Sequence, residues 1–434
     1  MAPGTVLIFT NSDTPRLRYI AGILLGDTLG LRWDVVCDRR RLGKHPVINY
    51  STEKVAGSFR IEPSGLLTEK GISAINILVS DWKGLPVFFR SDGEPDFPFD
   101  IFSAAFYLIT RYEEYLPHDA DAYGRFRASS SLAFRNGFLD KPVVDLWAWE
   151  FAKGLLRKFQ SLTFRRNEFR SLLTVNIGQP SASRGRNFMG SVSGFFHNLA
   201  SAAVHSDHHQ GTGNGEKDPF RVFKYIFDKI DSTGTDCKFF LPMGDNSRFD
   251  RNPSWKNDDF RKTILKISDR YDVCLQLSYD AADSSTETSR EQKRLMSVLS
   301  RGVERGRVHH LKSLLPGPYA NIERSGLKED YSMGYPDQPG FRAGTARSFY
   351  LYNLQEERQS GLKIVPFQFR DTSSEAEKTI DPATARTMIR KLLDATRKAG
   401  GTFVSVWYTE SLIENEKCRA WRDVFEYLLE IQAK

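Results

Sequence analysis

The sequence predicts an α/β fold in which a small N-terminal α/β domain precedes a distorted (β/α) barrel. Two observations carry this prediction: the chain has 434 residues, and strand-like and helix-like segments alternate regularly after residue 170. A chain of this length normally forms two or three domains of about 100–200 residues. We therefore expect an N-terminal domain over residues 1–165 and a barrel over residues 166–434.

In the first part of the chain, apolar residues recur at helical spacing in three segments. Residues 6–9 are apolar and β-prone, so they predict the first strand. Helices are predicted over residues 15–29, 98–116 and 145–159. Their aromatic faces are typical of a buried core.

The second part predicts parallel strands separated by helices. Strands are expected at residues 172–177, 238–241, 273–277, 308–311, 364–369 and 403–407. Helices are expected after residue 218, around residues 260–267, at 291–303 and at 381–400. Asp218 and Asp381 each precede a proline, which indicates a helix N-cap followed by proline in the first turn. The tract 206–218 has no apolar side chain and predicts a polar loop.

The composition narrows the classes of partner. The 61 lysines and arginines exceed the 54 acidic residues by seven, and this surplus is spread along the chain. Such a distribution indicates a solvated surface and no nucleic-acid partner. No segment approaches the ~18 apolar residues of a membrane span, and the N-terminus lacks the features of a signal peptide. We therefore expect a cytoplasmic protein.

Cysteine and histidine patterns point to no metal site. Cys37, Cys237, Cys274 and Cys418 are far apart and form no CxxC motif, so free thiols are expected, with Cys274 buried. The histidines at 205–209 adjoin a glycine-rich polar segment that offers no rigid frame for metal ligands. Motifs of P-loop proteins, HExxH metalloproteases and GxSxG hydrolases are absent from the sequence.

Several long phrases resemble one protein family. They are TPRLRYI at 14–20, LPVFF at 85–89, PFDIFSAAFYLITRYEEYLP at 98–117, GFLDKPVVDLWA at 137–148, DYSMGY at 330–335 and PGFRAGT at 339–345. Together they resemble the polysaccharide deacetylase (NodB-homology) family, in a bacterial branch with an extra N-terminal α/β domain. The resemblance implies a hydrolase fold of carbohydrate metabolism that removes acetyl groups from N-acetylated sugars.

The family resemblance also implies a mechanism. A divalent metal such as zinc, held by one aspartate and two histidines, activates water, a second aspartate is the base, and another histidine is the acid. Metal binding lowers the pKa of water toward ~7, and acid and base must both reach the reacting centre. Each of these positions can be located in the sequence.

The matching positions are substituted. Asn176 stands at the base position, Gly178 at the metal-aspartate position, Gln276 at a metal-histidine position and Tyr408 at the acid position. The arginine of the third motif is retained as Arg342. We therefore expect an altered active site, with no metal and no other cofactor.

Asn176, Arg342 and Tyr408 form the predicted catalytic set. The predicted substrate-binding residues are Gln276, Tyr279, His309 and Trp407, of which His309 lies in the VHHLK tract of this branch. Aromatic rings stack on sugars, and arginine binds carboxylate or hydroxyl oxygens. Packing roles for Trp407 and Tyr279, a buried salt bridge for Arg342 and a core role for His309 remain open alternatives.

Three functional hypotheses follow. In the first, the protein has lost metal-dependent hydrolysis and binds a glycan or a partner enzyme of polysaccharide biosynthesis. In the second, it is an active metal-dependent carbohydrate deacetylase that uses other ligands, such as His309 or the histidines at 205–209. In the third, it is a structural or regulatory subunit of polysaccharide assembly without a ligand.

Overall fold

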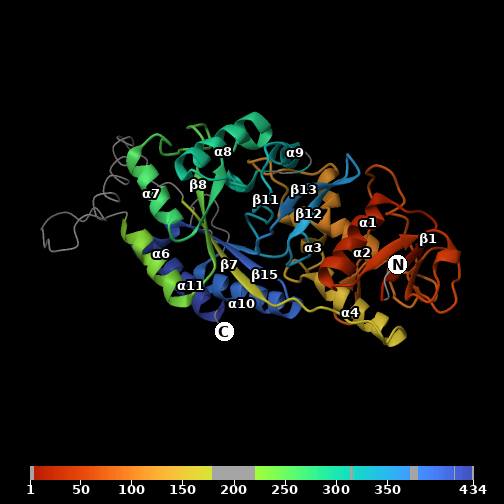
Figure 1. Cartoon of the computed structure of the whole chain (residues 1–434). Helices are drawn as coiled ribbons and strands as arrows, with labels where there is room; N and C mark the ends of the chain where they lie inside the picture. The colour runs from red at the N-terminus through yellow and green to blue at the C-terminus, as the bar shows by residue number, and fades with distance from the viewer. Residues whose placement is uncertain are drawn as a thin grey trace, which may run out of the picture.

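The protein contains two large β-sheets whose strands are mostly parallel. The computed structural model describes residues 4–177, 220–312, 315, 317–371, 380–414 and 416–432. A four-stranded sheet lies in the N-terminal part and a nine-stranded sheet in the rest (Figure 1). Gly178, the histidines at 205–209 and the expected polar loop at 206–218 lie outside the described residues.

The N-terminal sheet has the strand order β2-β1-β3-β4, and all its pairs are parallel. Its strands are β1 (Val6–Thr10), β2 (Trp33–Val36), β3 (Val47–Tyr50) and β4 (Phe59–Arg60). Helix α1 (Pro15–Ala21) begins where Thr14 Oγ1 accepts a hydrogen bond from the Leu17 amide, with Pro15 in the first turn. It continues as the π-helix η1 (Gly22–Thr28), so the predicted helix is confirmed with a wider second half.

Three further helices and a hairpin complete this region. They are α2 (Ile101–Ile109), α3 (Leu132–Arg135) and α4 (Val143–Lys158), with the antiparallel strands β5 (Ser80–Trp82) and β6 (Leu85–Val87). Helix α2 is shorter than predicted because Asp100 caps its start and Arg111 adopts φ 55° just after its end. Phe102, Trp147 and Phe151 are fully buried, which confirms that the aromatic faces form the core.

The larger sheet has the order β12-β13-β11-β10-β9-β8-β7-β15-β14. Its strands are β7 (Arg170–Asn176), β8 (Cys237–Pro242), β9 (Asp272–Leu277), β10 (Arg305–Val308), β11 (Glu329–Asp330), β12 (Phe349–Asn353), β13 (Arg358–Ile364), β14 (Phe369–Arg370) and β15 (Thr402–Tyr408). All neighbours are parallel except β12 and β13. The expected mixed α/β fold with a large parallel sheet is confirmed.

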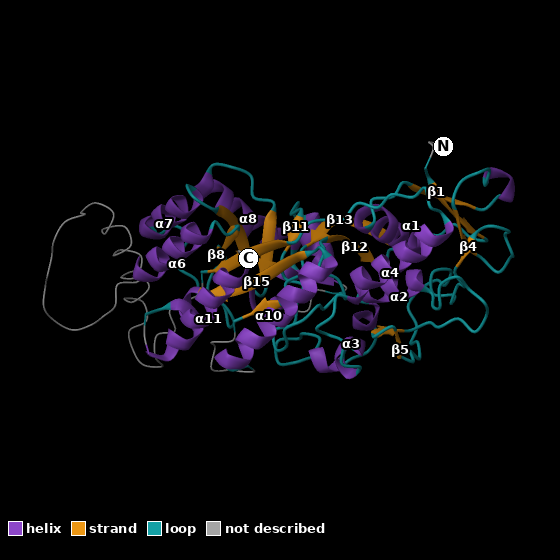
Figure 2. Ribbon diagram, turned by 90° about the horizontal axis from the view of Figure 1, so that it is seen from below, coloured by secondary structure: helices purple, strands orange, loops and turns teal. Residues whose placement is uncertain are grey.

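Amphipathic helices cover this sheet. They are α6 (Phe220–Thr233), α7 (Asp258–Ser268), α8 (Ser285–Leu299), α9 (Gly317–Arg324), α10 (Pro382–Ala399) and α11 (Glu416–Gln432). Asp381 caps α10 by accepting hydrogen bonds from the Ala383 and Thr384 amides, and Gly400 ends it at φ 68°. Seen from below, α10 and α11 lie against the sheet beside β15 (Figure 2). Among the described residues, none of the helices has the length and apolarity that crossing a bilayer requires.

The sheet curls so that distant strands meet. The segment after β13 donates from the Val365 amide to the Asp330 carbonyl, on the β11 side. A few residues later the Gln368 amide donates to the Val404 carbonyl, on the β15 side. One buried apolar cluster joins residues of β7, β8, β9 and β15 to residues that follow β10, β11 and β13: Leu172, Phe240, Cys274, Leu311, Tyr331, Phe367, Val404 and Val406.

Two expectations for the second region are corrected. The strand predicted at 308–311 ends at Val308, because His310 and Leu311 adopt φ 55° and 53°, which no strand permits. The strand predicted at 364–369 is the junction between β13 and β14. The four cysteines, all among the described residues, form no disulfide, and Cys274 is buried, as expected. Burial raises the pKa of the Cys274 thiol to about 12.

Candidate functional site

The carboxyl ends of the parallel strands bring several predicted site residues together. Asn176 ends β7 directly opposite Tyr408, which ends β15. Gln276 near the end of β9 lies opposite Arg307 of β10. In parallel sheets, ligands usually bind at this edge, so the strand ends form the first candidate site.

Arg307 occupies the interior of this edge. Its Nη1 donates to Asn176 Oδ1 and its Nη2 to Thr174 Oγ1, each over 2.9 Å. Its Nε donates to the Tyr331 carbonyl over 2.9 Å, and its guanidinium lies 4.3 Å from the Phe240 ring centroid. The side chain therefore reaches from β10 to β7 across the curled sheet.

The guanidinium of Arg307 is a buried charge that forms no ion pair in the described part of the chain, although the charge of the buried Asp330 raises its pKa against the effect of burial. Its exposed fraction is 0%, and no carboxylate there forms an ion pair with it. Burial lowers the pKa of Arg307 to about 10, so the group stays cationic at neutral pH. Neutral acceptors such as the Asn176 amide oxygen satisfy its donors.

Gln276 is buried beside this arginine. Its Oε1 has no hydrogen-bond partner among the described residues. An amide oxygen is a weak ligand for a divalent metal, and the nearby guanidinium repels cations. The interior residues therefore do not fit the metal that the family resemblance implies.

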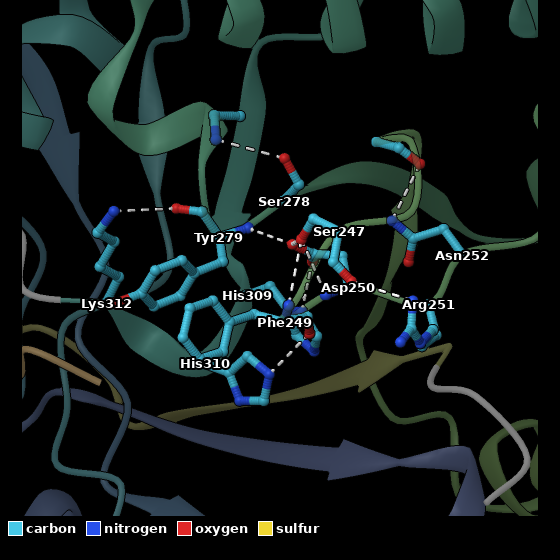
Figure 3. Close-up of polar contacts among 12 residues, drawn as sticks. Ser247, Phe249, Asp250, Arg251, Asn252, Ser278, Tyr279, His309, His310 and Lys312 are labelled. Carbon is cyan, nitrogen blue, oxygen red and sulfur yellow. Dashed lines mark hydrogen bonds and ion pairs between the residues drawn. The ribbon is translucent and has the colours of Figure 1, made fainter. Parts of the chain in front are cut away.

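A second group of residues lies in the loops after β8, β9 and β10 (Figure 3). We call this group the rim; it comprises Ser247, Phe249, Asp250, Tyr279, His309, His310 and Lys312. His309 Nδ1 lies 2.7 Å from Asp250 Oδ1. Asp250 is 1% exposed at its side chain and also accepts from the Tyr279 amide and the Ser247 hydroxyl. The buried carboxylate thus fixes the orientation of the imidazole.

The other face of the imidazole remains accessible. His309 is 17% exposed, and its Nε2 has no hydrogen-bond partner in the described chain. Burial alone would raise the pKa of Asp250, but the hydrogen bond and charge of His309 hold it below the ordinary value. An imidazole held at Nδ1 and free at Nε2 can accept or donate a proton.

Aromatic rings and cations surround the pair. Tyr279 lies 4.2 Å from Phe249 between ring centroids, and the Lys312 ammonium lies 4.2 Å above the Tyr279 ring. His310 stacks on Tyr123 of the N-terminal region at 4.7 Å. This rim therefore offers amphipathic rings and hydrogen-bond donors together.

Acidic groups lie on the opposite side of the strand ends. Asp371, directly after β14, accepts from the Tyr408 amide through Oδ2, and its Oδ1 has no partner among the described residues. Burial raises the pKa of Asp371 to about 7. Burial and the charge of Asp371 raise the pKa of Glu410 to about 8. Tyr408 is half-buried beside them.

Two predicted site residues lie elsewhere. Trp407 is 0% exposed and packs against Phe369, Trp421 and Phe425, so a sugar has no access to its ring in this structure. Arg342 forms a buried bidentate ion pair with Glu114 of the N-terminal region. Both placements match the packing alternatives, and neither residue joins Asn176.

Sequence reasoning missed Arg307, Asp250 and Asp371. An arginine between apolar neighbours in a buried strand is a signal that was available for Arg307. Asp250 lies in an irregular loop 59 residues before His309, so only the folded chain brings the two together. Among the described residues, no three histidine, cysteine, aspartate or glutamate side chains are placed to hold a metal ion.

Comparisons with known proteins gave a match to one family model and matches to solved structures. Residues 6–160 match the model of a family of unknown function (DUF7033). One solved structure, "putative polysaccharide deacetylase from Mycobacterium smegmatis", is 12% identical, with a TM-score of 0.37, and the match covers 61% of this chain and 85% of that chain. A TM-score this low does not establish a common fold. No curated protein matches the chain.

Proposed function

We propose that this is a polysaccharide-deacetylase-like protein of carbohydrate metabolism that has lost metal-dependent hydrolysis and binds a glycan. The observation that carries the proposal is the contact between Arg307 and Asn176. An amide bound to a permanent cation has no basicity, and that cation disfavours a divalent metal nearby. The substitution at the base position thus coincides with a hydrogen bond from a buried arginine to the amide that stands there.

We also infer that the nine strands close into a distorted (β/α) barrel. The backbone bonds from Val365 to β11 and from Gln368 to β15 support closure, because one continuous segment would then join both halves. The reach of Arg307 from β10 to β7 supports it as well. In barrels, ligands bind at the carboxyl ends of the strands.

In this proposal the glycan binds at the rim. The part of the Tyr279 ring that Phe249 and Lys312 leave uncovered supplies surface for sugar C–H groups, and His309 Nε2 supplies a polar contact to a hydroxyl group. The Lys312 ammonium, which is paired with Asp283, borders this surface. Gln276, Asn176 and Tyr408 would lie deeper, below the bound sugar. Such a site would bind in the millimolar to micromolar range, about −4 to −8 kcal/mol.

The experiment combines glycan binding with acetate release from N-acetylated oligosaccharides. We expect binding without acetate release, and at least a tenfold loss of affinity in Tyr279→Ala. Tyr427→Ala is the matched control, because Tyr427 lies on α11 and contacts Arg390. Metal-dependent acetate release by the purified protein would contradict the proposal.

The His309–Asp250 pair favours a second candidate, a hydrolase that works without the family's metal site. His309 Nε2 would take a proton from water, and Asp250 would stabilise the resulting imidazolium. Acetate release that survives chelation and disappears in His309→Gln would establish this candidate. A subunit role would instead give no glycan binding and a co-purifying partner enzyme.

A further inference from the structure

A large cavity lies where the N-terminal region meets the beginnings of β7 and β15. Its volume is about 890 Å³, within the range of small-molecule sites. The π-helix η1 contributes Gly26 and Asp27 to its wall, and β13 contributes Lys363. This cavity is distinct from the rim, because Arg170 and Thr402 line it at the opposite ends of their strands.

The cavity wall carries a surplus of positive charge. Five cationic side chains line it, from three separate segments: Arg165, Arg166 and Arg170 from residues 165–170, Arg347, and Lys363. The acidic side chains in the wall are Asp27 and Glu168.

The cations of the wall differ in how far they are already engaged. Arg347 is held by Asp145, which lies outside the cavity wall, over 3.1 Å. Arg165 donates from Nε to Asn167 Oδ1 over 3.3 Å. Arg170 and Lys363 have no side-chain hydrogen bond or ion pair with any described residue, so their donors are available to a ligand.

Close backbone packing shapes the wall. A Cβ on Gly30 would lie 2.8 Å from Arg165 Cβ, and a Cβ on Gly400 would lie 2.5 Å from the Asn167 carbonyl oxygen. Larger residues would therefore displace the segment that presents the arginines. The π-helical form of η1 widens the neighbouring turn, a feature frequent at functional sites.

We propose that this cavity binds a small molecule bearing a phosphate group. Arginine forks pair with phosphate oxygens bidentately, and a lysine adds a compact charge. Arg170 and Lys363 provide the main contacts, and Arg165 and Arg166 add positive charge to the same wall. Asp27 opposes the anion and is positioned to accept from hydroxyl groups of the same molecule.

Calorimetric titration with inorganic pyrophosphate tests the site on the full chain. We expect saturable binding that weakens at least tenfold when Arg170→Gln and Lys363→Gln are combined. Asp27→Asn should strengthen pyrophosphate binding severalfold, because it removes the opposing charge of the wall. Circular dichroism and thermal unfolding verify that each variant is folded.

A charge-matched control separates a built site from general attraction. Lys262→Gln combined with Arg290→Gln removes two exposed cations of α7 and α8, and we expect unchanged affinity. Equal weakening in both double variants, or no saturable binding, would overturn the proposal. Preferential binding of glucuronate, lost in the cavity variant, would overturn the phosphate assignment in favour of a carboxylate.

Discussion

The interior and the rim of the larger sheet differ in how their polar side chains are hydrogen-bonded. In the interior, Arg307 is fully buried and its guanidinium nitrogens donate to Asn176, Thr174 and the Tyr331 carbonyl. On the rim, His309 is fixed at one nitrogen by Asp250 and left free at the other. The donors of Arg307 are used by buried acceptors, although Gln276 Oε1 beside it has no partner among the described residues, whereas His309 keeps an unpartnered nitrogen on a side chain that is 17% exposed.

Under the proposed function, the interior has lost metal-dependent hydrolysis and the rim binds the ligand. A buried cation with neutral acceptors stabilises the strand ends but cannot activate water. An oriented imidazole beside aromatic rings is suited to recognition or proton transfer. The interior should therefore respond to mutation through stability, and the rim through ligand binding.

The largest expected effect is that of Trp407→Ala. The ring is buried among Phe369, Trp421 and Phe425, so its removal should cost about 3–5 kcal/mol of unfolding free energy. Urea unfolding measures the loss, and glycan affinity of the folded fraction should not change. Lost affinity with unchanged stability would restore Trp407 to the binding site.

Arg307→Met should be the next largest. It leaves the Asn176, Thr174 and Tyr331 oxygens without their buried donor, and such groups cost about 1–3 kcal/mol each, so we expect a loss of about 3 kcal/mol. Arg305→Met is the control on the same strand. Arg305 is half-exposed, and its surface ion pairs should contribute under ~1 kcal/mol. Equal losses would refute the special role of the interior arginine.

Asp371→Asn should change how stability depends on pH. Burial raises the pKa of Asp371 to about 7, so the folded protein binds a proton that the unfolded chain has released above about pH 4. Stability of the wild type should therefore fall between about pH 4 and 7. The asparagine variant should lose this slope and gain about 1 kcal/mol or more at pH 8. Parallel pH profiles would show that Asp371 is ionised in the fold.

Asp250→Asn should have the smallest effect on stability. Unlike Asp371→Asn, it should destabilise the protein at neutral pH. The pKa of Asp250 is lowered in the fold by His309 against the effect of burial, so its stabilising contribution is present above about pH 4 and lost as pH falls. The variant should therefore be less stable by about 1 kcal/mol at pH 7 and equal to the wild type below about pH 3. A loss of stability that persists below pH 3 would refute the ionic role of Asp250.

Local patterns predicted β1, β7, β8, β9, β15 and α10, but they missed the strands β2, β3, β4, β11 and β12 and the helices α9 and α11, and they did not predict the long-range contacts. Residues 381–400 were predicted as a helix because the Asp-Pro start and the glycine end are local signals, and α10 has these bounds within a residue. The strand expected at 308–311 ends at Val308 because His310 and Leu311 adopt positive φ angles, which histidine and leucine rarely do and which their residue types therefore did not predict. The family motifs located Asn176 and Tyr408 at strand ends, whereas the contact of Arg307 with Asn176 crosses from β10 to β7 and that of Asp371 with Tyr408 needs the pairing of β14 with β15.

In the proposed function, the Arg307 guanidinium takes the place of a metal ion at the carboxyl ends of the strands. The most direct measurement is the zinc content of purified protein after incubation with excess zinc and dialysis, by plasma mass spectrometry. We expect well below one zinc per chain in the wild type and in His309→Gln alike. Close to one tightly bound zinc per chain in the wild type, lost in Asn176→Ala or Gln276→Ala, would contradict it.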